Sequence, residues 1–282
     1  MRNRQVAIIA MIGGIVVFGI KLVAYFISNS VALLSDALES IVNIAASGLM
    51  LFAVYVSEKP ADQNHDYGHQ KIEEISRMLE GLFIIAAAIL IVYAAAGRLF
   101  EPVALFQVNL AVGVSVLATG INAALSYYLG HMARRSGSAA LEGDSKHLLS
   151  DVISSFGVWV GLLVSQLTGW SVLDPLLAFF VAVLIVRMGI SLMMKSSQNL
   201  MEQSCDEEER RIEEVFLRHK SRFVDFHDMK TRRLGNQVMA ELHLVVDSQM
   251  SVKDAHDFTD HLEEDIEKEL PGTKIIIHIE SK

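Results

Sequence analysis

Apolar residues gather in long blocks before residue 195, and no such block follows. Each block holds about 20 residues, the length that an α-helix needs to cross the hydrocarbon core of a bilayer. The blocks cover residues 6–27, 32–56, 75–99, 108–129, 148–167 and 173–194. We therefore expect an all-α bundle of six transmembrane helices, which forms a transport domain over residues 1–200.

The pattern changes after residue 200, where short segments replace the long blocks. A charged helical segment, EEERRIEEVFLRHKS, is followed by two alternating segments, VDFHDMKTRRL and QVMAELHLVVD. Alternation is typical of strands with one buried face, and the Gly-Asn pair between the two segments favours a hairpin. A second helix begins at the capping residue Ser251 and ends at Pro271, and TKIIIHIE is a final strand. The order αββαβ predicts a ferredoxin-like, metallochaperone-like α+β domain over residues 201–282, which we expect to be cytoplasmic.

Lysine and arginine gather in the connections on one side of the expected helices. These residues are Arg2, Arg4, Lys59, Lys71, Arg77, Arg134, Arg135, Lys146 and Lys195. The opposite connections have only Arg98 nearby, so the positive-inside tendency makes both termini cytoplasmic. The first block is too long for the apolar region of a signal peptide and carries Lys21. We interpret it as a retained helix of a multi-pass plasma (inner) membrane protein.

Composition narrows the class of partner. The formal net charge of -9 lies mainly at the C-terminal end, which argues against nucleic acid and suits the attraction of cations. The single cysteine, Cys205, excludes an intrachain disulfide and a cysteine-rich zinc site. The apolar blocks hold no HExxH pair and no Ser/His constellation of a hydrolase, so we do not expect an enzyme.

Ionisable residues inside the apolar blocks point to a metal site. His147 and Asp151 in HLLSD stand four residues apart, and Glu39 and Asn43 repeat that spacing in the second block, with Asp36 one turn before Glu39. Residues four apart share one face of a helix. A charge at membrane depth costs about 2.5–3.5 kcal/mol and usually marks an ion or proton path. Each residue alone is more often structural, but the repeated pairs favour a cage for a divalent metal between two helices.

The connection after the second block, EKPADQNHDYGHQKIEEI, holds another cluster. Asp62, His65 and His69 stand three and four residues apart, with Asp66 beside them. A proline-led loop can fold so that this spacing brings the three side chains around one metal ion. A solvated polar loop explains the same residues equally well, so both interpretations stay open.

Histidines recur on the expected elements of the C-terminal domain. They are His227, His243 and His278 on three different strands and His256 and His261 on the second helix, with Glu280 on the strand face of His278. Taken singly, each is more often a surface residue. As a set they are equally compatible with a metal site, and both interpretations stay open.

These features together resemble the cation diffusion facilitator family of divalent-metal/proton antiporters, of the type of the bacterial zinc and iron exporters. The matching segments are SVALLSDALESIVNIAAS, PADQNHDYGHQKIEE, GDSKHLLSDVISS, HDMKTRRLG, ELHLVV, DAH and IIIHIE, which span nearly the whole chain. HLLSD together with the loop from PAD to YGH-x-K is specific evidence for this family, whereas a single HxxxD motif would be weak evidence. The resemblance implies a homodimer whose soluble domains meet across a two-fold axis.

The resemblance also implies ligands at three metal sites. It maps a transport site onto Glu39, Asn43, His147 and Asp151, a loop site onto Asp62, His65 and His69, and a regulatory site onto His227, His243, His256, His278 and Glu280. Zinc members usually have Asp or His at both second-helix positions, so Glu39 and Asn43 depart from the pattern. His147 still favours zinc, whereas the extra oxygen ligands suit manganese or iron(II), and cobalt is also possible. Asp36 is the candidate to compensate.

The expected function is export of a divalent transition-metal cation from the cytoplasm, by alternating access and in exchange for protons. The ligands must lose protons to bind a cation, and His147 is the expected proton carrier because the unperturbed pKa of histidine is about 6.5. The metal is then both substrate and regulator, no further cofactor is required, and the partners are a second copy of the chain and the lipid bilayer. The alternative is a membrane-anchored metal sensor that does not transport, although an anchor has no use for carboxylates buried in the membrane.

Overall fold

A computed structural model describes residues 3–28, 31–100, 108–168, 173–235 and 237–282. Within the described helices some side chains are also undescribed, those of residues 31–39 among them. The chain divides into two compact units, Met1–Ser197 and Gln198–Lys282. Each unit has hydrophobic clusters of its own, so each is described by itself.

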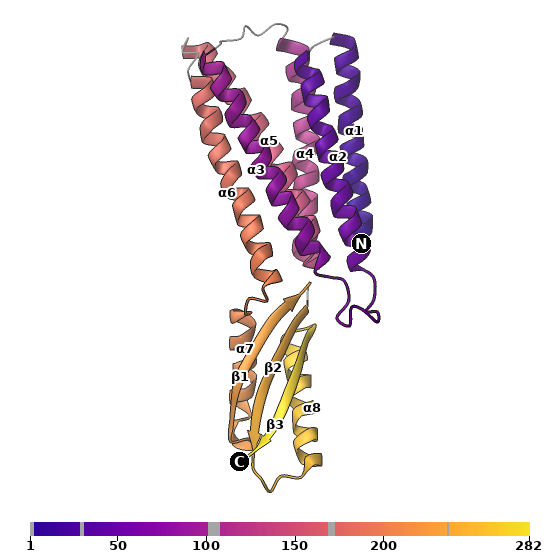
Figure 1. The fold of residues 1–282 in the computed structure, drawn as a ribbon, viewed down its shortest axis with the longest axis vertical. Coiled ribbons are helices and arrows are strands. Elements are labelled where there is room, and N and C mark those ends of the chain that lie inside the picture. Colours follow the sequence, from indigo (N-terminus) through magenta and orange to yellow (C-terminus); the bar gives the residue numbers. More distant parts are fainter. Residues whose placement is uncertain (1–2, 29–30, 101–107, 169–172, 236) are drawn as a thin grey trace. The chain divides into compact units, whose positions relative to one another are not determined.

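The first unit consists of long helices that run side by side (Figure 1). They are α1 (Asn3–Ser28), α2 (Val31–Ser57), α3 (Ile72–Phe100), α4 (Val108–Ser136), α5 (Ala139–Thr168) and α6 (Leu173–Leu200). Each predicted apolar block lies in one of these helices, which confirms the membrane-type helical region. Among the described residues, Asn3–Val23, Ile72–Tyr93 and Phe179–Leu200 are long and apolar enough to cross a membrane by length and composition alone.

Helix α5 begins at Ala139, although the apolar block predicted a start at residue 148. The prediction that His147 and Asp151 begin their helix is therefore wrong, since both lie in its interior. Hydropathy excluded the polar EGDSK segment, yet these residues are helical because they are buried against other helices, as Asp144 is against Ser47. Gly137, with φ +68°, ends α4, and Ser138 caps the first turn of α5 by accepting the Leu141 N–H at 3.3 Å.

Glycine lets α3 and α6 touch through their backbones. A Cβ on Gly81 would lie 2.8 Å from the carbonyl oxygen of Gly189, and a Cβ on Gly189 would lie 2.8 Å from that of Gly81. The contact continues along both helices through Ile84, Ala88, Ala182, Ile185 and Leu192. Small residues at a helix interface allow the close approach that stabilises membrane bundles, where lipid offers no hydrophobic drive for association.

The second unit has the predicted order αββαβ. Its elements are α7 (Asp206–Arg218), a short 3-10 helix (Lys220–Arg222), β1 (Asp225–Leu234), β2 (Gln237–Val246), α8 (Val252–Glu269) and β3 (Thr273–Ser281). The strand order is β1-β2-β3, with β1 antiparallel and β3 parallel to the central β2. Ser251 caps α8 as predicted, because its Oγ accepts the Asp254 N–H at 3.1 Å.

One face of this sheet forms the core with the two helices. Leu242, Leu244 and Val246 alternate along β2 and are buried with Phe216 of α7 and Phe258 of α8. The residues between them point to the opposite face of the sheet because side chains alternate along a strand. The sheet therefore has a covered face and an open face, and His243 belongs to the open one.

Replacing Gly81 by alanine should destabilise the bundle by about 1–3 kcal/mol, because the new Cβ would overlap the Gly189 carbonyl oxygen. Gly120→Ala is the matched control, since no described atom lies within 4 Å of its added Cβ. Alanine favours a helix over glycine by about 1 kcal/mol, so the control should unfold at an equal or higher temperature than the wild type. Thermal unfolding in detergent, followed by circular dichroism, measures both variants. Equal midpoints for Gly81→Ala and the wild type would contradict the backbone contact.

Candidate metal centres

Three of the predicted transport-site residues meet inside the bundle. Asn43 of α2 donates from Nδ2 to Oδ2 of Asp151 on α5 at 2.5 Å, and Nε2 of His147 lies 3.2 Å from Oδ1 of Asn43. His147 and Asn43 are 2% and 6% exposed, so the three side chains form a hydrogen-bonded chain that is largely shielded from solvent. An imidazole nitrogen, an amide oxygen and a carboxylate oxygen are donors that a divalent transition metal accepts.

Glu39 and Asp36 belong to the predicted set but their side chains lie outside the described residues. The backbone of α2 is continuous through both positions. The four-residue spacing along this helix puts Glu39 on the face of Asn43. Their membership of the site therefore stays a prediction.

Two further carboxylates, which sequence reasoning missed, are buried near His147. Glu80 of α3 and Asp144 of α5 are both 0% exposed. Asp144 accepts hydrogen bonds from Ser47 Oγ at 3.1 and 3.2 Å. Oε2 of Glu80 lies 3.8 Å from Nδ1 of His147, which is too long for a hydrogen bond. Neither Glu80 oxygen nor this nitrogen has a hydrogen-bond partner among the described residues, so two unsatisfied groups face each other.

The buried acids lie where α3 crosses α5 closely, and the buried Lys21 lies near one of them, Asp151. A Cβ on Gly143 of α5 would lie 2.9 Å from Cγ of Glu80, so glycine at this position lets α3 approach α5 closely enough to bring Glu80 beside the site. Lys21 of α1 is buried and close enough to Asp151 for an electrostatic interaction. The site thus draws on α1, α2, α3 and α5.

The sequence holds a weak signal for Glu80 and Asp144. Glu80 lies inside the block 75–99, where a carboxylate is as costly as Asp151 in its own block. Asp144 stands three residues before His147 and therefore on nearly the same helix face. The pairing of α3 with α5 decides that Glu80 meets His147, and that pairing is not readable from spacing along one helix.

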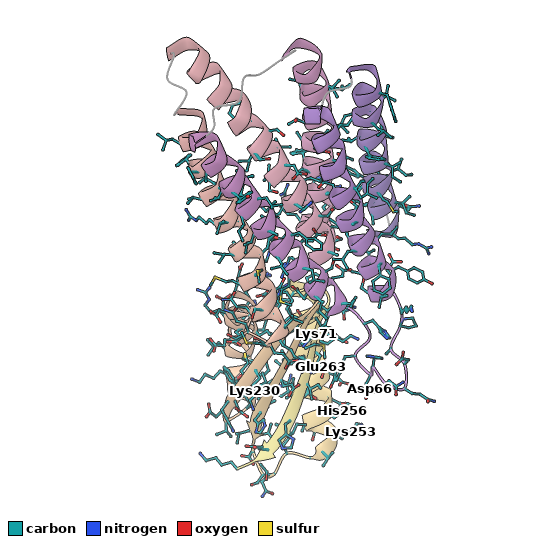
Figure 2. The ribbon with its side chains drawn as sticks, turned by 45° about the horizontal axis from the view of Figure 1, so that its top comes forward. Asp66, Lys71, Lys230, Lys253, His256 and Glu263 are labelled. Atoms are coloured by element: carbon teal, nitrogen blue, oxygen red, sulfur yellow. The ribbon has the colours of Figure 1, made fainter. Side chains whose placement is uncertain are left out.

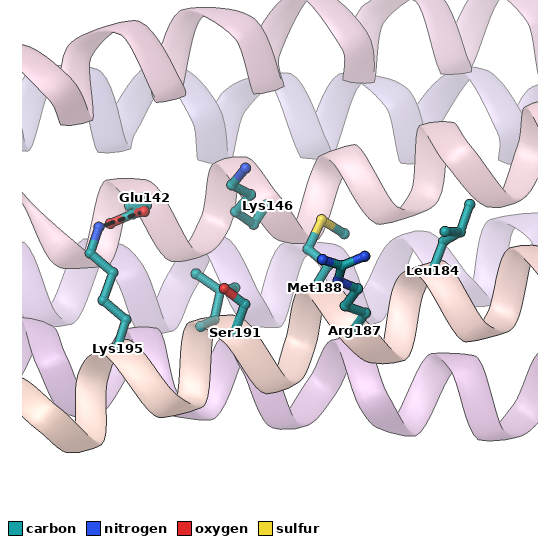
Figure 3. Close-up of a pocket in the computed structure, with 8 residues that line it drawn as sticks. Glu142, Lys146, Leu184, Arg187, Met188, Ser191 and Lys195 are labelled. Carbon is teal, nitrogen blue, oxygen red and sulfur yellow. Dashed lines mark hydrogen bonds and ion pairs between the residues drawn. The ribbon is translucent and has the colours of Figure 1, made fainter.

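A cavity of about 470 Å³ between α5 and α6 differs in charge from this site (Figure 3). Lys195 donates to Glu142 at 2.8 and 2.9 Å, and Lys146 and Arg187 line the same cavity. Three cationic side chains against one carboxylate give a positive lining, which repels a divalent cation. We therefore place no cation site there.

The connection between α2 and α3 brings the three predicted loop ligands together. Nδ1 of His65 lies 3.1 Å from Oδ1 of Asp62, and Nε2 of His69 lies 3.4 Å from Oδ2. The Asn64 N–H donates to the Asp62 carboxylate at 2.9 Å, and this bond is the main reason that the pKa of Asp62 is lowered. The three ligand atoms lie within 4.8 Å of one another, which one metal ion can bridge. This convergence is compatible with metal binding and with a hydrogen-bonded loop, so the loop site stays a prediction.

The three strand histidines form a row across the open face of the sheet. His227 pairs with His243, and His243 pairs with His278, in the strand register. Glu280 Oε1 lies 2.9 Å from His243 Nδ1, and its Oε2 lies 3.6 Å from His227 Nε2. The ring of His278 lies 4.9 Å from that of His243. His227, His243 and Glu280 therefore offer three ligand atoms within 4.8 Å, with His278 beside them.

His256, the remaining member of the predicted regulatory set, lies on α8 (Figure 2). Its side chain is 70% exposed, and its Nδ1 lies 3.4 Å from Asp260 Oδ1. The described residues that converge with Glu280 are His227 and His243, without His256. Its role as a ligand stays a prediction.

The chain matches two family models that together cover both units. Residues 7–201 match the cation efflux transmembrane domain, and residues 205–282 match the cation efflux protein cytoplasmic domain. The membrane site and the loop site fall in the first match, and the histidine row falls in the second.

Similar proteins include transporters of near-equal length. An uncharacterized transporter of Synechocystis sp. is 36% identical over 278 residues, which are 98% of this chain and 90% of that protein. The cation-efflux pump FieF of Shewanella oneidensis is 30% identical over 259 residues, which are 92% of this chain and 87% of that protein. Among solved structures, the metal-bound C-terminal domain of the CzcD transporter from Thermotoga maritima is 29% identical, covers 27% of this chain and 87% of that chain, and has a TM-score of 0.25.

Replacing Glu80 by leucine should shift stability and metal affinity in opposite directions. Loss of a buried carboxylate without a hydrogen-bond partner should raise the unfolding midpoint of the metal-free protein. A metal on Nε2 of His147 leaves a proton on Nδ1 that needs an acceptor, and loss of such an acceptor lowers affinity about 10–100-fold. Thermal unfolding and calorimetric titration with Zn²⁺ in detergent measure the two effects.

Two variants serve as controls for this prediction. Glu80→Gln keeps a neutral acceptor and should recover part of the affinity. Glu73→Gln, on the same helix, weakens bonds of 2.5 Å from Ser57 and Ser138 and should lower the midpoint without changing the affinity. Wild-type Zn²⁺ affinity in Glu80→Leu would exclude Glu80 from the site.

Proposed function

The chain belongs to the cation efflux family and is a cation efflux transporter, and we propose that it exports divalent transition-metal cations, zinc foremost, in exchange for protons by alternating access. This family is the cation diffusion facilitator family that the sequence motifs predicted. The observation that carries the proposal is the buried convergence of Asn43, His147 and Asp151 within the matched membrane domain. A cation-efflux pump among the relatives supports the direction of transport.

The hydrogen bonds at the site support proton exchange. Oδ1 of Asn43 can only accept, so Nε2 of His147 carries the proton in the bond between them. A cation that binds Nε2 must displace this proton, since coordination needs the nitrogen lone pair. Protons that arrive from the other side of the membrane reverse the exchange and release the cation.

Asn43 supports a broad choice of metal. An amide oxygen carries no net charge and is a weaker ligand than a carboxylate, and Asn43 also donates to one oxygen of Asp151. Zinc favours nitrogen ligands in compact tetrahedral sites, whereas manganese and iron(II) accept more oxygen ligands. His147 keeps zinc as the preferred substrate, and manganese, iron(II) and cobalt are the expected secondary ones.

The histidine row supports regulation by cytoplasmic metal in a homodimer. The match to the cytoplasmic domain of cation efflux proteins supports both the dimer and a cytoplasmic C-terminus in the inner membrane protein. A metal held by His227, His243 and Glu280 would stabilise one arrangement of the two copies and so couple the metal load to transport.

Asp151→Asn should abolish gradient-driven transport, because it removes the anionic ligand that pairs with His147 across Asn43. The measurement is Zn²⁺ uptake into proteoliposomes with an imposed pH gradient. Glu214→Gln, an exposed acid on α7, is the charge-matched control and should transport as the wild type does. Undiminished uptake by Asp151→Asn would refute the proposed site. Tight metal binding with no gradient-driven movement in the wild type would favour the non-transporting sensor.

Asn43→Asp should shift the preference toward zinc over manganese and iron(II), because it restores the residue type that the family resemblance associates with zinc members and removes the amide that donates to Asp151. Competition among zinc, manganese, iron(II) and cobalt in the same proteoliposomes measures the shift. An unchanged order of preference would show that the amide does not set selectivity.

A further inference from the structure

A second histidine-acid cluster lies in the helical layer of the cytoplasmic unit. His219 is the residue that follows α7, and His261 and Asp265 stand four residues apart on α8. Nε2 of His219 lies 3.1 Å from Oδ2 of Asp265, and Nε2 of His261 lies 3.6 Å from the same oxygen. The three ligand atoms lie within 4.8 Å of one another.

The two distances to Asp265 are compatible with a tetrahedral site, and the shorter one is also a hydrogen-bond distance. Ligands about 2.0–2.1 Å from a zinc ion are separated from one another by roughly 3.3–3.4 Å when the geometry is tetrahedral. The two separations of 3.1 and 3.6 Å fall on either side of that value. The two imidazole rings lie 5.1 Å apart at an angle of 85°, so both nitrogens approach Asp265 without their rings colliding.

The surrounding residues hold this geometry in place. The ring of His219 packs edge-on against the fully buried Phe258 at 6.3 Å, and the His219 N–H donates to the Phe216 carbonyl at 2.9 Å. Lys268 donates to Oδ1 of Asp265 at 3.1 Å and so leaves Oδ2 to the histidines. The same bond is the main reason that the pKa of Asp265 is lowered, which keeps the carboxylate ionised.

The cluster is separate from the histidine row on the sheet. The row lies on the open face, whereas α7 and α8 cover the other face through Phe216, Phe258 and the alternate residues of β2. The hydrophobic core therefore stands between the two sets of ligands. The segment HLEED, His261 to Asp265, also repeats the H-x3-D spacing of HLLSD at the membrane site.

We propose that His219, His261 and Asp265 form a further binding site for a zinc-class divalent cation, which links the end of α7 to α8. Three protein ligands leave a fourth position for water, as in open zinc sites rather than closed structural ones. The site is reached from solvent, because the His261 side chain is 45% exposed. The positive charge of Lys268 beside Asp265 weakens the site, which suits binding at a high metal load. This binding site would be present whether or not the protein transports metal as proposed.

Cobalt(II) titration of the full-length protein in detergent tests the proposal, because tetrahedral Co²⁺ has a strong visible absorption. The other three sites are disabled by Asp62→Asn, Asp151→Asn and His243→Ala. One equivalent of tetrahedral Co²⁺ should remain in this background, and adding Asp265→Asn should remove it. His261→Asn should do the same without disturbing the packing of His219 on Phe258.

Glu264→Gln is the matched control, since it removes one negative charge from the neighbouring position on α8 and should leave the absorption unchanged. Co²⁺ should also raise the unfolding midpoint of the background protein but not of the Asp265→Asn variant. If the background does not fold, the comparison moves to the otherwise wild-type chain, where Asp265→Asn should lower the bound Co²⁺ by one equivalent. Absence of the remaining equivalent, or its persistence after Asp265→Asn, would overturn the site. Neither result depends on transport.

Discussion

The helical unit must stabilise several carboxylates that are buried between its helices, away from water. Asp144 is buried with hydrogen bonds from Ser47, and Asp151 has Asn43 as a donor and Lys21 as a nearby cation. Glu80 is equally buried but has no hydrogen-bond partner among the described residues. Burial of an uncompensated carboxylate is costly, and a dication among these groups would relieve that cost. The burial of Glu80 without a hydrogen-bond partner would thus contribute to the affinity of the proposed site for a cation.

Spacing along single helices predicted that Asn43, His147 and Asp151 meet, but not that Glu80 and Asp144 lie beside them. HLLSD and the Glu39–Asn43 pair could be recognised in the sequence because residues four apart on an apolar helix share a face. In the structure, Asn43 contacts both His147 and Asp151. Glu80 was not readable, since its place beside His147 follows from α3 crossing α5 at Gly143. The early start of α5 was missed because hydropathy treats buried polar turns as loops.

In the second unit, residues 198–282, alternation and capping residues predicted the order of elements, because each strand has one buried face and Ser251 caps α8. The histidines of the row were recognisable one by one, but their alignment depends on the pairing of His227 with His243 and of His243 with His278. His219 was not recognised, because it meets Asp265 only through the packing of α7 against α8. Local pattern thus predicts which side chains are available, and tertiary contact decides which of them meet.

The backbone contact between Gly81 and Gly189 has a mechanical consequence. The close contact of α3 and α6 at these two glycines, with the buried side chains packed beside it, favours movement of the two helices together. Glu80 stands directly before Gly81 on α3. A change in the angle between α3 and α5 would alter the gap of 3.8 Å between Glu80 and Nδ1 of His147, and with it the electric field at that imidazole. The orientation of α3 and α6 would thereby affect the electrostatic potential at His147, a proposed metal ligand.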